Sequence, residues 1–238
     1  MTGATVQSCG PGSLTAFRRR VKRSMEAVCR AMFREGIHGV RVRNERVAVP
    51  NLVRIMEATL AVANEKGFAA MSLRDLAGRT GLSMGGLYAY IGSKEDLVAL
   101  IQAQGGRQTR QVMEAELEGV ADPRERLRTA IRTHLYLSEV LRPWFFFAYM
   151  EARQLPARLR AQAIGMERDT EALFAGIIAD GQRRGVFREI DPLVAAGFVK
   201  AVLQDWYLKH GKHAERGLSV DAYAEQVEAL AMKYLEDT

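Results

Sequence analysis

The sequence has little of what marks secreted, membrane-spanning or cysteine-rich proteins. It contains only two cysteines, Cys9 and Cys29, which cannot build a disulfide framework or a four-cysteine metal site. No apolar run approaches the roughly 18–20 residues that span a bilayer, and residues 1–13 are too small and polar for a secretory signal. With 48% hydrophobic and 26% charged residues, the composition is that of a globular chain. These observations predict a soluble, cytoplasmic protein.

Motifs that carry catalysis are also missing. The sequence has no Gly-rich phosphate loop, no Gly-x-Ser-x-Gly and no Cys-x-x-Cys. Its four histidines are scattered, and the pair His210 and His213 has no obvious third metal ligand. We therefore predict that the chain is not an enzyme, has no catalytic residues and uses neither a cofactor nor a metal.

Positive charge is concentrated at the start of the chain. The formal net charge is +6, and residues 1–50 alone hold 10 Lys and Arg against 3 Glu, a local charge of +7. Residues 51–100 hold 5 charges of each sign. The densest basic group is Arg18, Arg19, Arg20, Lys22 and Arg23. Such a segment indicates an anionic partner, nucleic acid or a membrane surface; the alternative is a solvated helix face without a partner.

Apolar periodicity predicts an all-α fold. Gaps of three and four between apolar residues predict a helix over about 14–34, opened by Ser13 and ended by Gly36. Valines alternating with charged residues over 40–49 predict a short hairpin or an extended arm, and Pro50 predicts a boundary there. Further helices are expected over about 123–141, 143–154, 157–184, 192–210 and 219–236. The predicted domains are a basic extension (1–50), a DNA-binding domain (51–100) and a helical effector-binding and dimerisation domain (101–238).

The segment from Leu73 to Ile91 has the pattern of a helix-turn-helix. Ser72 begins a capping box that opens a short first helix. Gly81 follows where a tight turn between two helices needs a backbone with positive φ. The second helix, Ser83 to Ile91, is the candidate recognition element. The apolar positions that hold the two helices together are Leu73, Leu76, Ala77, Leu82, Leu87 and Tyr90.

The wider stretch from about Asn51 to Leu100 resembles the DNA-binding domain of the tetracycline-repressor (TetR) family. The residues that carry the resemblance are Ile55-Met56-Glu57-Ala58, Glu65-Lys66-Gly67-Phe68, Met71-Ser72-Leu73-Arg74-Asp75-Leu76-Ala77, Gly81-Leu82-Ser83, Leu87-Tyr88-Ala89-Tyr90 and Ser93-Lys94-Glu95-Asp96-Leu97. The resemblance implies a homodimeric regulator, usually a repressor, that binds a palindromic operator in double-stranded DNA. It also implies a helical C-terminal part that dimerises and binds a small effector, which releases the DNA.

The resemblance assigns DNA contacts residue by residue. Phosphate contacts are implied for Ser72, Tyr88, Tyr90 and Lys94, and base reading for the front of the recognition helix, Met84, Gly85 and Gly86. Ser83, at the start of that helix, is a further candidate DNA contact. The sequence departs from the family pattern at Gly86, Ala89 and Ile91, where Thr, His and Phe are common. Adjacent glycines leave few side chains to read bases, so recognition is expected to rest on close backbone approach, the Tyr side chains and DNA shape.

Each assignment has a structural alternative. Ser72 and Ser83 cap helices in any protein, and Tyr90 is expected to be partly buried while Tyr88 is exposed. Lys94 stands in a first helical turn, where the dipole disfavours a cation, which argues mildly for a phosphate contact. The basic extension supplies further candidate DNA contacts, Arg18, Arg19, Arg20, Arg41 and Arg43. The alternatives are that helix 14–34 packs on its own body or on a partner subunit, or that translation begins further along the chain.

The C-terminal part carries the candidate effector site. Aromatic and polar residues suited to a pocket between helices are His134, Trp144, Phe147, Glu151, Arg153, Phe174 and Trp206. The alternative is ordinary core with a solvated rim. Segments 147–153 and 181–187 loosely resemble TetR regulators of lipid and acyl-CoA metabolism, in which Arg183 and Arg184 would suit phosphates.

Apolar stripes on the last two helices are the predicted dimer interface. The stripes are Leu193, Ala196, Val199, Leu203 and Trp206, then Val220, Tyr223, Val227, Leu230 and Tyr234. The rival function is a membrane-surface or other anion-binding helical protein that uses the basic helix 14–34.

Overall fold

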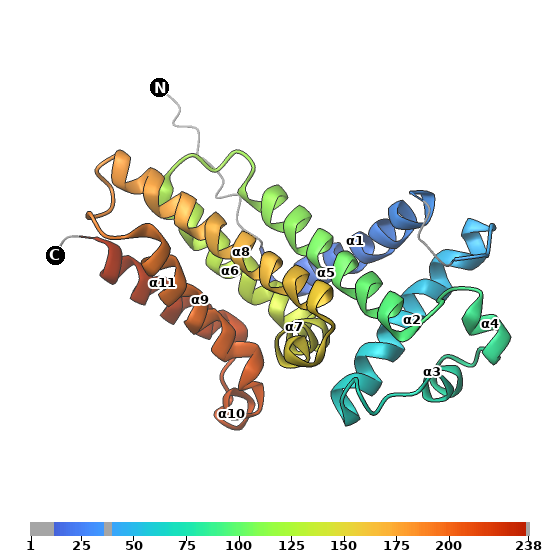
Figure 1. The fold of residues 1–238 in the computed structure, drawn as a ribbon. Helices are drawn as coiled ribbons and strands as arrows, with labels where there is room; N and C mark the ends of the chain where they lie inside the picture. Colours follow the sequence, from blue (N-terminus) through green and yellow to red (C-terminus); the bar gives the residue numbers. More distant parts are fainter. Residues whose placement is uncertain (1–11, 36–39, 237–238) are drawn as a thin grey trace. The chain divides into compact units, whose positions relative to one another are not determined.

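A computed structural model describes residues 12–35 and 40–236 and confirms the all-α fold (Figure 1). No helix in these ranges is long and apolar enough to cross a membrane. The elements are α1 (Leu14–Arg34), α2 (Glu45–Lys66), α3 (Leu73–Thr80), α4 (Met84–Tyr88), α5 (Lys94–Leu117), α6 (Pro123–Val140), α7 (Arg142–Met150), the 3₁₀ turn η1 (Ala152–Gln154), α8 (Ala157–Arg183), α9 (Pro192–Leu208), α10 (His210–Glu215) and α11 (Val220–Leu235).

Most predicted helices are found within a few residues of their expected bounds. The predicted helix 14–34 is α1, and the five C-terminal helices correspond to α6, α7 with η1, α8, α9 and α11. The recognition helix is shorter than predicted, since its α-helical part ends at Tyr88 rather than Ile91. The short helix α10 was not predicted. Gly36, the expected end of α1, and Cys9 lie outside the described residues.

The expectation that helix starts only after Pro50 is wrong, and so is the hairpin or extended arm over 45–49. Helix α2 begins at Glu45 and carries Pro50 inside it. Proline removes one backbone donor there, but the side chain of Asn44 caps the helix by accepting from the backbone N–H of Arg46 at 3.0 Å. Burial of Ala48 and Val49 adds apolar packing that a hairpin would not give. Only residues 40–44 of the predicted arm are non-helical.

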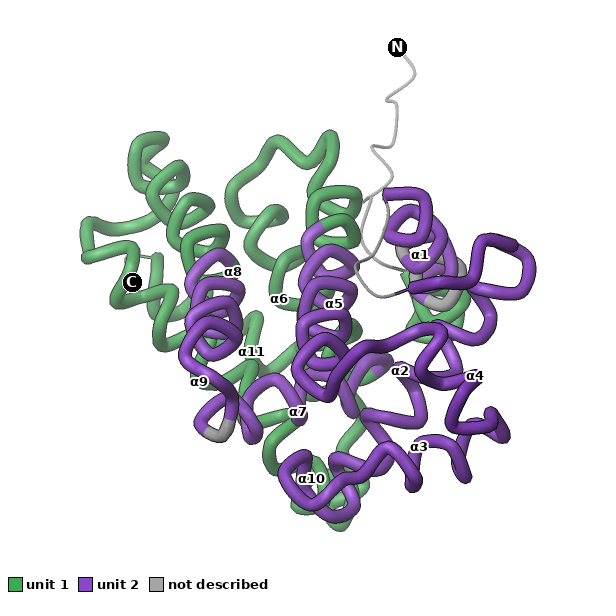
Figure 2. Tube along the Cα trace, turned by 45° about the vertical axis from the view of Figure 1, so that its right-hand side comes forward, with its two compact units in different colours: residues 1–19, 111–139, 170–238 green, residues 20–110, 140–169 purple. Residues whose placement is uncertain are grey.

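The chain divides into two compact units, each built from separated segments (Figure 2). Unit 1 comprises residues 1–19, 111–139 and 170–238, and unit 2 comprises residues 20–110 and 140–169. Unit 2 therefore contains α2, α3 and α4 together with α7, while unit 1 contains α9, α10 and α11 and all of α6 except Val140. The long helices α1, α5 and α8 contribute residues to both units. The predicted domain limits at residues 50 and 100 stay predictions.

Most of the larger apolar side chains described on α1 are buried. Within unit 1, Phe17 is fully buried and its ring meets that of Tyr136 edge-on at 5.4 Å. Within unit 2, Val21 and Cys29 are fully buried, and the backbone carbonyl of Val21 accepts a hydrogen bond from Gln108 Nε2 at 2.8 Å. A helix whose apolar side is already covered cannot insert that side into a bilayer. Burial of these side chains therefore argues against the membrane-surface alternative, which requires an exposed apolar face on α1.

Candidate functional site

The turn between α3 and α4 has the geometry that a helix-turn-helix needs. Ser72 Oγ accepts from the backbone N–H of Asp75 at 3.2 Å, and Asp75 Oδ2 accepts from the backbone N–H of Ser72 at 2.7 Å, which completes the predicted capping box. Gly81 follows α3 with φ of 68°, the left-handed conformation that glycine adopts without strain. Both α2 and α4 pack against α3 (Figure 1). These local contacts fix the direction in which α4 leaves the turn.

The front of α4 is open to solvent. Ser83 Oγ caps the helix by accepting from the backbone N–H of Gly86 at 3.1 Å, and Leu87 turns inward and is fully buried. No heavy atom of the described residues would lie within 4 Å of a Cβ placed on Gly85. Met84 and Gly86 are half-buried, whereas Ser83 and Gly85 are exposed. The recognition helix thus offers a nearly bare backbone at its first turn.

The two tyrosines at the end of α4 differ in exposure, as expected. Tyr88 is 44% exposed. Tyr90 is only 4% exposed, more buried than predicted, and its hydroxyl accepts from Asn51 Nδ2 at 2.8 Å. Tyr90 therefore ties α2 to the segment after α4, which gives it a structural task inside unit 2. Its phosphate contact stays a prediction.

Lys94 is held by the backbone of the loop before α3. Its Nζ donates to the carbonyl oxygens of Phe68, Ala69 and Met71 at 2.7, 3.1 and 2.9 Å. An ammonium has three N–H donors, so these three carbonyls match its full capacity. The same Nζ lies 4.6 Å from the centre of the Phe68 ring, a cation–π contact. The position of Lys94 in a first helical turn, which argued for a phosphate, therefore has an explanation within the chain.

Two other contacts fasten the same loop. Glu151 Oε2 accepts from the backbone N–H of Phe68 at 3.3 Å, and the Phe68 ring meets that of Phe147 edge-on at 5.9 Å. Lys66 Nζ lies 2.5 Å from Asp75 Oδ2. The hydrogen bond from Lys66, followed by those from Ser72, holds the pKa of Asp75 well below its usual range. The approach to the helix-turn-helix is thus fixed by charged side chains.

The predicted basic contacts of the extension all lie at the surface. The side chains of Arg18, Arg19 and Arg20 on α1 are exposed, as are those of Arg41 and Arg43 in the segment before α2. The backbone N–H of Arg41 donates to the carbonyl oxygen of Ala89 at 2.7 Å. That bond joins the segment to the residue that follows the recognition helix.

The seven predicted effector residues are divided between the two units. Unit 2 holds Trp144, Phe147, Glu151 and Arg153, and unit 1 holds His134, Phe174 and Trp206. In unit 2, Trp144 Nε1 donates to the carbonyl of Ile101 at 3.2 Å, while Arg153 is exposed. Trp144 and Phe147 are buried.

The unit 1 members lie in its core. His134 is 1% exposed, its Nε2 lies 3.3 Å from Lys200 Nζ, and its ring meets that of Phe174 edge-on at 6.3 Å. Burial and then the charge of Lys200 lower the pKa of His134 well below its ordinary value, so its imidazole is neutral. Trp206 Nε1 donates to Glu139 Oε2 at 3.1 Å.

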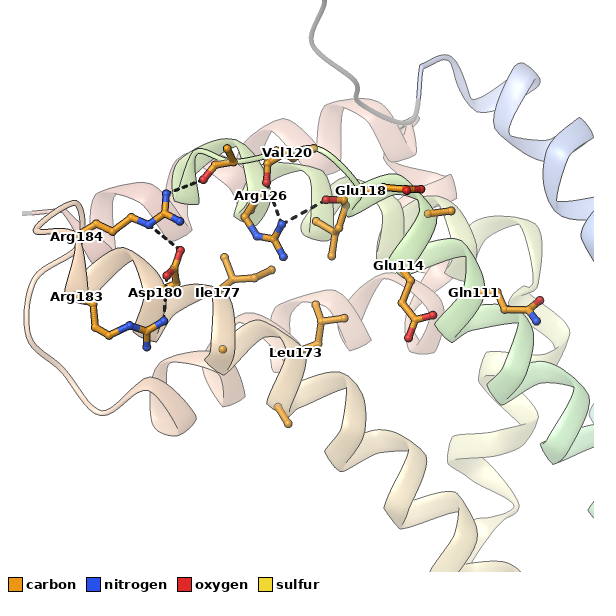
Figure 3. Close-up of a pocket in the computed structure, with 15 residues that line it drawn as sticks. Gln111, Glu114, Glu118, Val120, Arg126, Leu173, Ile177, Asp180, Arg183 and Arg184 are labelled. Carbon is orange, nitrogen blue, oxygen red and sulfur yellow. Dashed lines mark hydrogen bonds and ion pairs between the residues drawn. The ribbon is translucent and has the colours of Figure 1, made fainter.

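A surface pocket of about 940 Å³ in unit 1 lies between the end of α5 and α8 (Figure 3). Leu117, Leu173 and Ile177 supply apolar walls, and Arg183 and Arg184 lie at one end beside Asp180. The seven predicted effector residues are not among the described residues that line it. Sequence reasoning missed this pocket, although it singled out Arg183 and Arg184 as candidate phosphate ligands.

Sequence reasoning also missed Gln102 in unit 2. Its side chain lies in α5 and is 1% exposed, and neither atom of its amide is hydrogen-bonded to a described residue. The signal was available, since Gln102 directly follows the apolar run 97–101 in α5. A buried amide in this state favours a polar partner.

Comparisons with known proteins agree with this geometry. Residues 55–101 match the model of the bacterial regulatory proteins of the tetR family, and residues 120–235 match the tetracyclin repressor-like C-terminal domain. The TetR family transcriptional regulator PfmR from Thermus thermophilus is 30% identical, with a TM-score of 0.64, over 76% of this chain and 97% of that one.

Two further relatives are more distant. The HTH-type transcriptional regulator HbdR from Aromatoleum sp. (strain CIB) is 23% identical over 73% of this chain and 75% of its own length. The transcriptional regulator FadR from Bacillus subtilis, solved in complex with stearoyl-CoA, is 20% identical, with a TM-score of 0.65, over 77% of this chain and 99% of that one. Matches to both halves of the family's architecture, joined to the helix-turn-helix found in unit 2, establish that the chain belongs to the TetR family of transcriptional regulators.

Proposed function

We propose that this chain is a cytoplasmic repressor that binds a palindromic operator as a homodimer and is released by a small apolar or acyl-type effector. The observation that carries the proposal is the open front of α4 behind the Gly81 turn, because a helix can enter the major groove only if its first turn is uncovered. With Gly85 and Gly86 there, base selection rests on backbone approach and DNA shape.

The DNA-binding part is tested with duplexes that the wild-type protein selects from a random-sequence pool. We expect two half-sites related by a two-fold axis, and a loss of affinity of about tenfold when Tyr88→Ala removes an exposed contact beside the groove, a cost typical of one good contact. Tyr149→Ala is the matched control, since Tyr149 is 45% exposed in α7 and Tyr88 is 44% exposed. Equal affinities for the two variants would remove Tyr88 from the interface, and no selected duplex would remove the function.

Exposed apolar side chains on α9 and α11 support dimerisation. Leu193, Val194, Phe198 and Leu230 are 51–59% exposed. Most other members of the predicted stripes, such as Leu203, are buried within unit 1, so the uncovered face differs from the predicted one and includes Phe198. Large exposed apolar side chains that gather on one face are typical of interfaces.

The dimer is tested by the mass of the protein in solution. Phe198→Glu places a charge in the proposed interface and should shift the sedimentation mass from two chains to one, with loss of two-site DNA binding. Ile164→Glu, at a side chain that is 41% exposed in α8, is the control and should leave the dimer intact. A Phe198→Glu protein that stays dimeric would move the interface elsewhere.

The effector class rests on the resemblance to FadR, which was solved with stearoyl-CoA, and on the pocket of unit 1. Its apolar walls suit an acyl chain, and Arg183 and Arg184 suit a phosphate, although both are ion-paired to Asp180 at 2.9 and 3.1 Å. We expect stearoyl-CoA to release DNA at lower concentration than stearate or coenzyme A alone. Arg183→Gln/Arg184→Gln should weaken that release, whereas Arg158→Gln/Arg160→Gln, at exposed arginines of α8, should not.

The arginines of α1 remain candidate phosphate contacts in this proposal. Arg18→Gln/Arg19→Gln should then reduce the slope of log affinity against log salt by about 0.9 for each phosphate contact removed. An unchanged slope would leave α1 with its packing role alone.

A further inference from the structure

The segment that leads into α2, together with the first two residues of that helix, is strongly basic and lies outside the residues that the family model matches. Residues 40–46, here named the basic linker, precede that match, which begins at residue 55. They contain Arg41, Arg43 and Arg46, all exposed, and one acidic residue, Glu45. The linker is therefore a feature of this chain that the helix-turn-helix motif does not account for.

Its acidic residue is already neutralised from α1. Glu45 accepts from Arg34 Nε at 2.8 Å and lies 3.3 Å from Arg30 Nε. Hydrogen bonding from Arg34 correspondingly lowers the pKa of Glu45. Arg41, Arg43 and Arg46, in contrast, make no ion pair with any residue that the structure describes. Three cations are thus left facing solvent.

The backbone of the linker is joined to the recognition helix. The Arg41 N–H donates to the carbonyl of Ala89 at 2.7 Å, and Ala89 directly follows α4. Along the linker, Val40 and Val42 are half-buried while Arg41 and Arg43 are exposed. In an extended segment alternate side chains share a face, so the two arginines lie on the same side of the segment.

The helix-turn-helix region supplies little net charge of its own. Residues 51–100 carry 5 basic and 5 acidic side chains, and the ammonium of Lys94 is bound to backbone carbonyls. DNA affinity nevertheless depends strongly on phosphate neutralisation by Lys and Arg. Guanidinium groups held next to the reading helix are well suited to that task, because they bind phosphate oxygens in pairs.

We propose that the basic linker is a second DNA-contacting element, in which Arg41 and Arg43 bind backbone phosphates flanking the groove that α4 enters. The inference rests on the proposed DNA-binding function and extends it to residues outside the helix-turn-helix. The hydrogen bond to Ala89 sets the position of the linker, and the two ion pairs to Glu45 hold its far end to α1.

The test is the salt dependence of binding by the full chain. The probe is a duplex that the wild-type protein selects from a random-sequence pool, and affinity is measured by fluorescence anisotropy over a series of KCl concentrations. Arg41→Gln/Arg43→Gln removes two charges but keeps the backbone N–H of residue 41. It should make the negative slope of log affinity against log salt less steep by about 1.8 per subunit, since each phosphate contact contributes about 0.9 to its magnitude.

The matched control is Arg168→Gln/Arg216→Gln, which removes two charges at exposed positions outside the linker. Its slope should equal that of the wild type, and the urea midpoints of all three proteins should agree. Hydroxyl-radical footprints should lose protection at the flanking sugars only in the linker variant. If the linker variant and the control have the same slope, the inference is overturned while the regulator function stands. If the wild type selects no duplex, the function itself falls.

A second pair of variants separates charge from position. Arg41→Pro and Arg41→Gln remove the same charge, but only proline also removes the N–H that donates to Ala89. The proline variant should lose at least threefold more affinity, because Arg43 is no longer held beside α4. Equal losses would overturn the role of the hydrogen bond in placing the linker.

Discussion

The dipeptide Gly-Gly occurs twice in the chain, at 85–86 and at 105–106, and the two copies serve opposite purposes. In α4, a Cβ on Gly85 would meet nothing within 4 Å among the described residues. In α5, a Cβ on Gly105 would lie 2.0 Å from the Trp144 indole, and one on Gly106 would lie 2.4 Å from the Met166 sulfur. Gly85 leaves the surface of α4 bare, whereas Gly105 and Gly106 let side chains pack against a helix backbone. The same dipeptide therefore has a different structural role in each helix, set by the side chains that surround it.

The largest effect should come from filling the packed pair. Gly105→Ala forces the Trp144 ring away from α5 and strains its hydrogen bond to Ile101. Overpacking of this kind costs about 1–3 kcal/mol in the free energy of unfolding, measured by urea denaturation. The control Gly78→Ala, in α3 with no described atom within 4 Å, should gain about 0.5–1 kcal/mol from helix propensity. A Gly105→Ala protein as stable as Gly78→Ala would show that the indole has room to move.

A loss of similar size is expected where a charged side chain, rather than a glycine, holds a helix in place. Lys94→Met keeps the aliphatic stem but removes three hydrogen bonds to the loop before α3. Hydrogen bonds to charged groups contribute roughly 1.5–3 kcal/mol, so we expect a loss of about 2 kcal/mol in urea denaturation. Lys233→Met, at an exposed lysine of α11, should lose nothing measurable. A normal stability with a reduced salt slope in DNA binding would instead identify Lys94 as a phosphate ligand.

Filling the bare pair should have the opposite sign. Gly85→Ala should stabilise the protein by up to about 1 kcal/mol, because alanine favours a helix where nothing obstructs its methyl group. The same methyl group stands at the open front of α4, so DNA affinity should fall about tenfold. Gly78→Ala should show the gain in stability without the loss in affinity. Unchanged binding by Gly85→Ala would show that the backbone there does not approach the bases.

The smallest effect is a pH dependence in unit 1, away from both glycine pairs. Burial alone would raise the pKa of Asp205, but hydrogen bonds from Lys209, Lys212 and His213 outweigh burial and lower it to about 2. A carboxyl group with a lowered pKa stabilises the folded protein above its unfolded pKa, and this contribution disappears as the pH falls from about 4 towards 2. Asp205→Asn should remove that part of the acid dependence, about 1 kcal/mol or less. An unchanged acid profile would contradict the assignment.

Local signals in the sequence predicted the elements well. The gaps of three and four gave α1, and Ser72, Gly81 and Ser83 marked the helix-turn-helix because caps and left-handed turns depend on neighbouring residues only. The expected start of the helix after Pro50 was wrong because it also rested on a local effect. Proline disfavours helix in the residue before it, but burial of Ala48 and Val49 and the Asn44 cap outweigh that preference.

The sequence did not predict which groups the charged side chains contact. Lys94 and Glu151 were proposed as contacts for DNA and effector, yet both bind the backbone around Phe68, far from them in the chain. The effector residues were chosen for their chemistry, and the fold distributes them over two units. Which helix faces meet depends on the packing of the whole chain, and a single sequence carries no direct record of it.

The buried thiol of Cys29 allows the opening of α1 to be measured by chemical labelling. Burial, followed by the charges of Glu57 and Glu26, raises the pKa of its thiol to about 12, and thiol reagents react with the thiolate. In a Cys9→Ser protein the rate of Cys29 labelling would therefore report how often α1 separates from the residues that bury this thiol. Adding operator DNA or effector to that assay would show whether the packing of α1 changes when the protein binds either ligand.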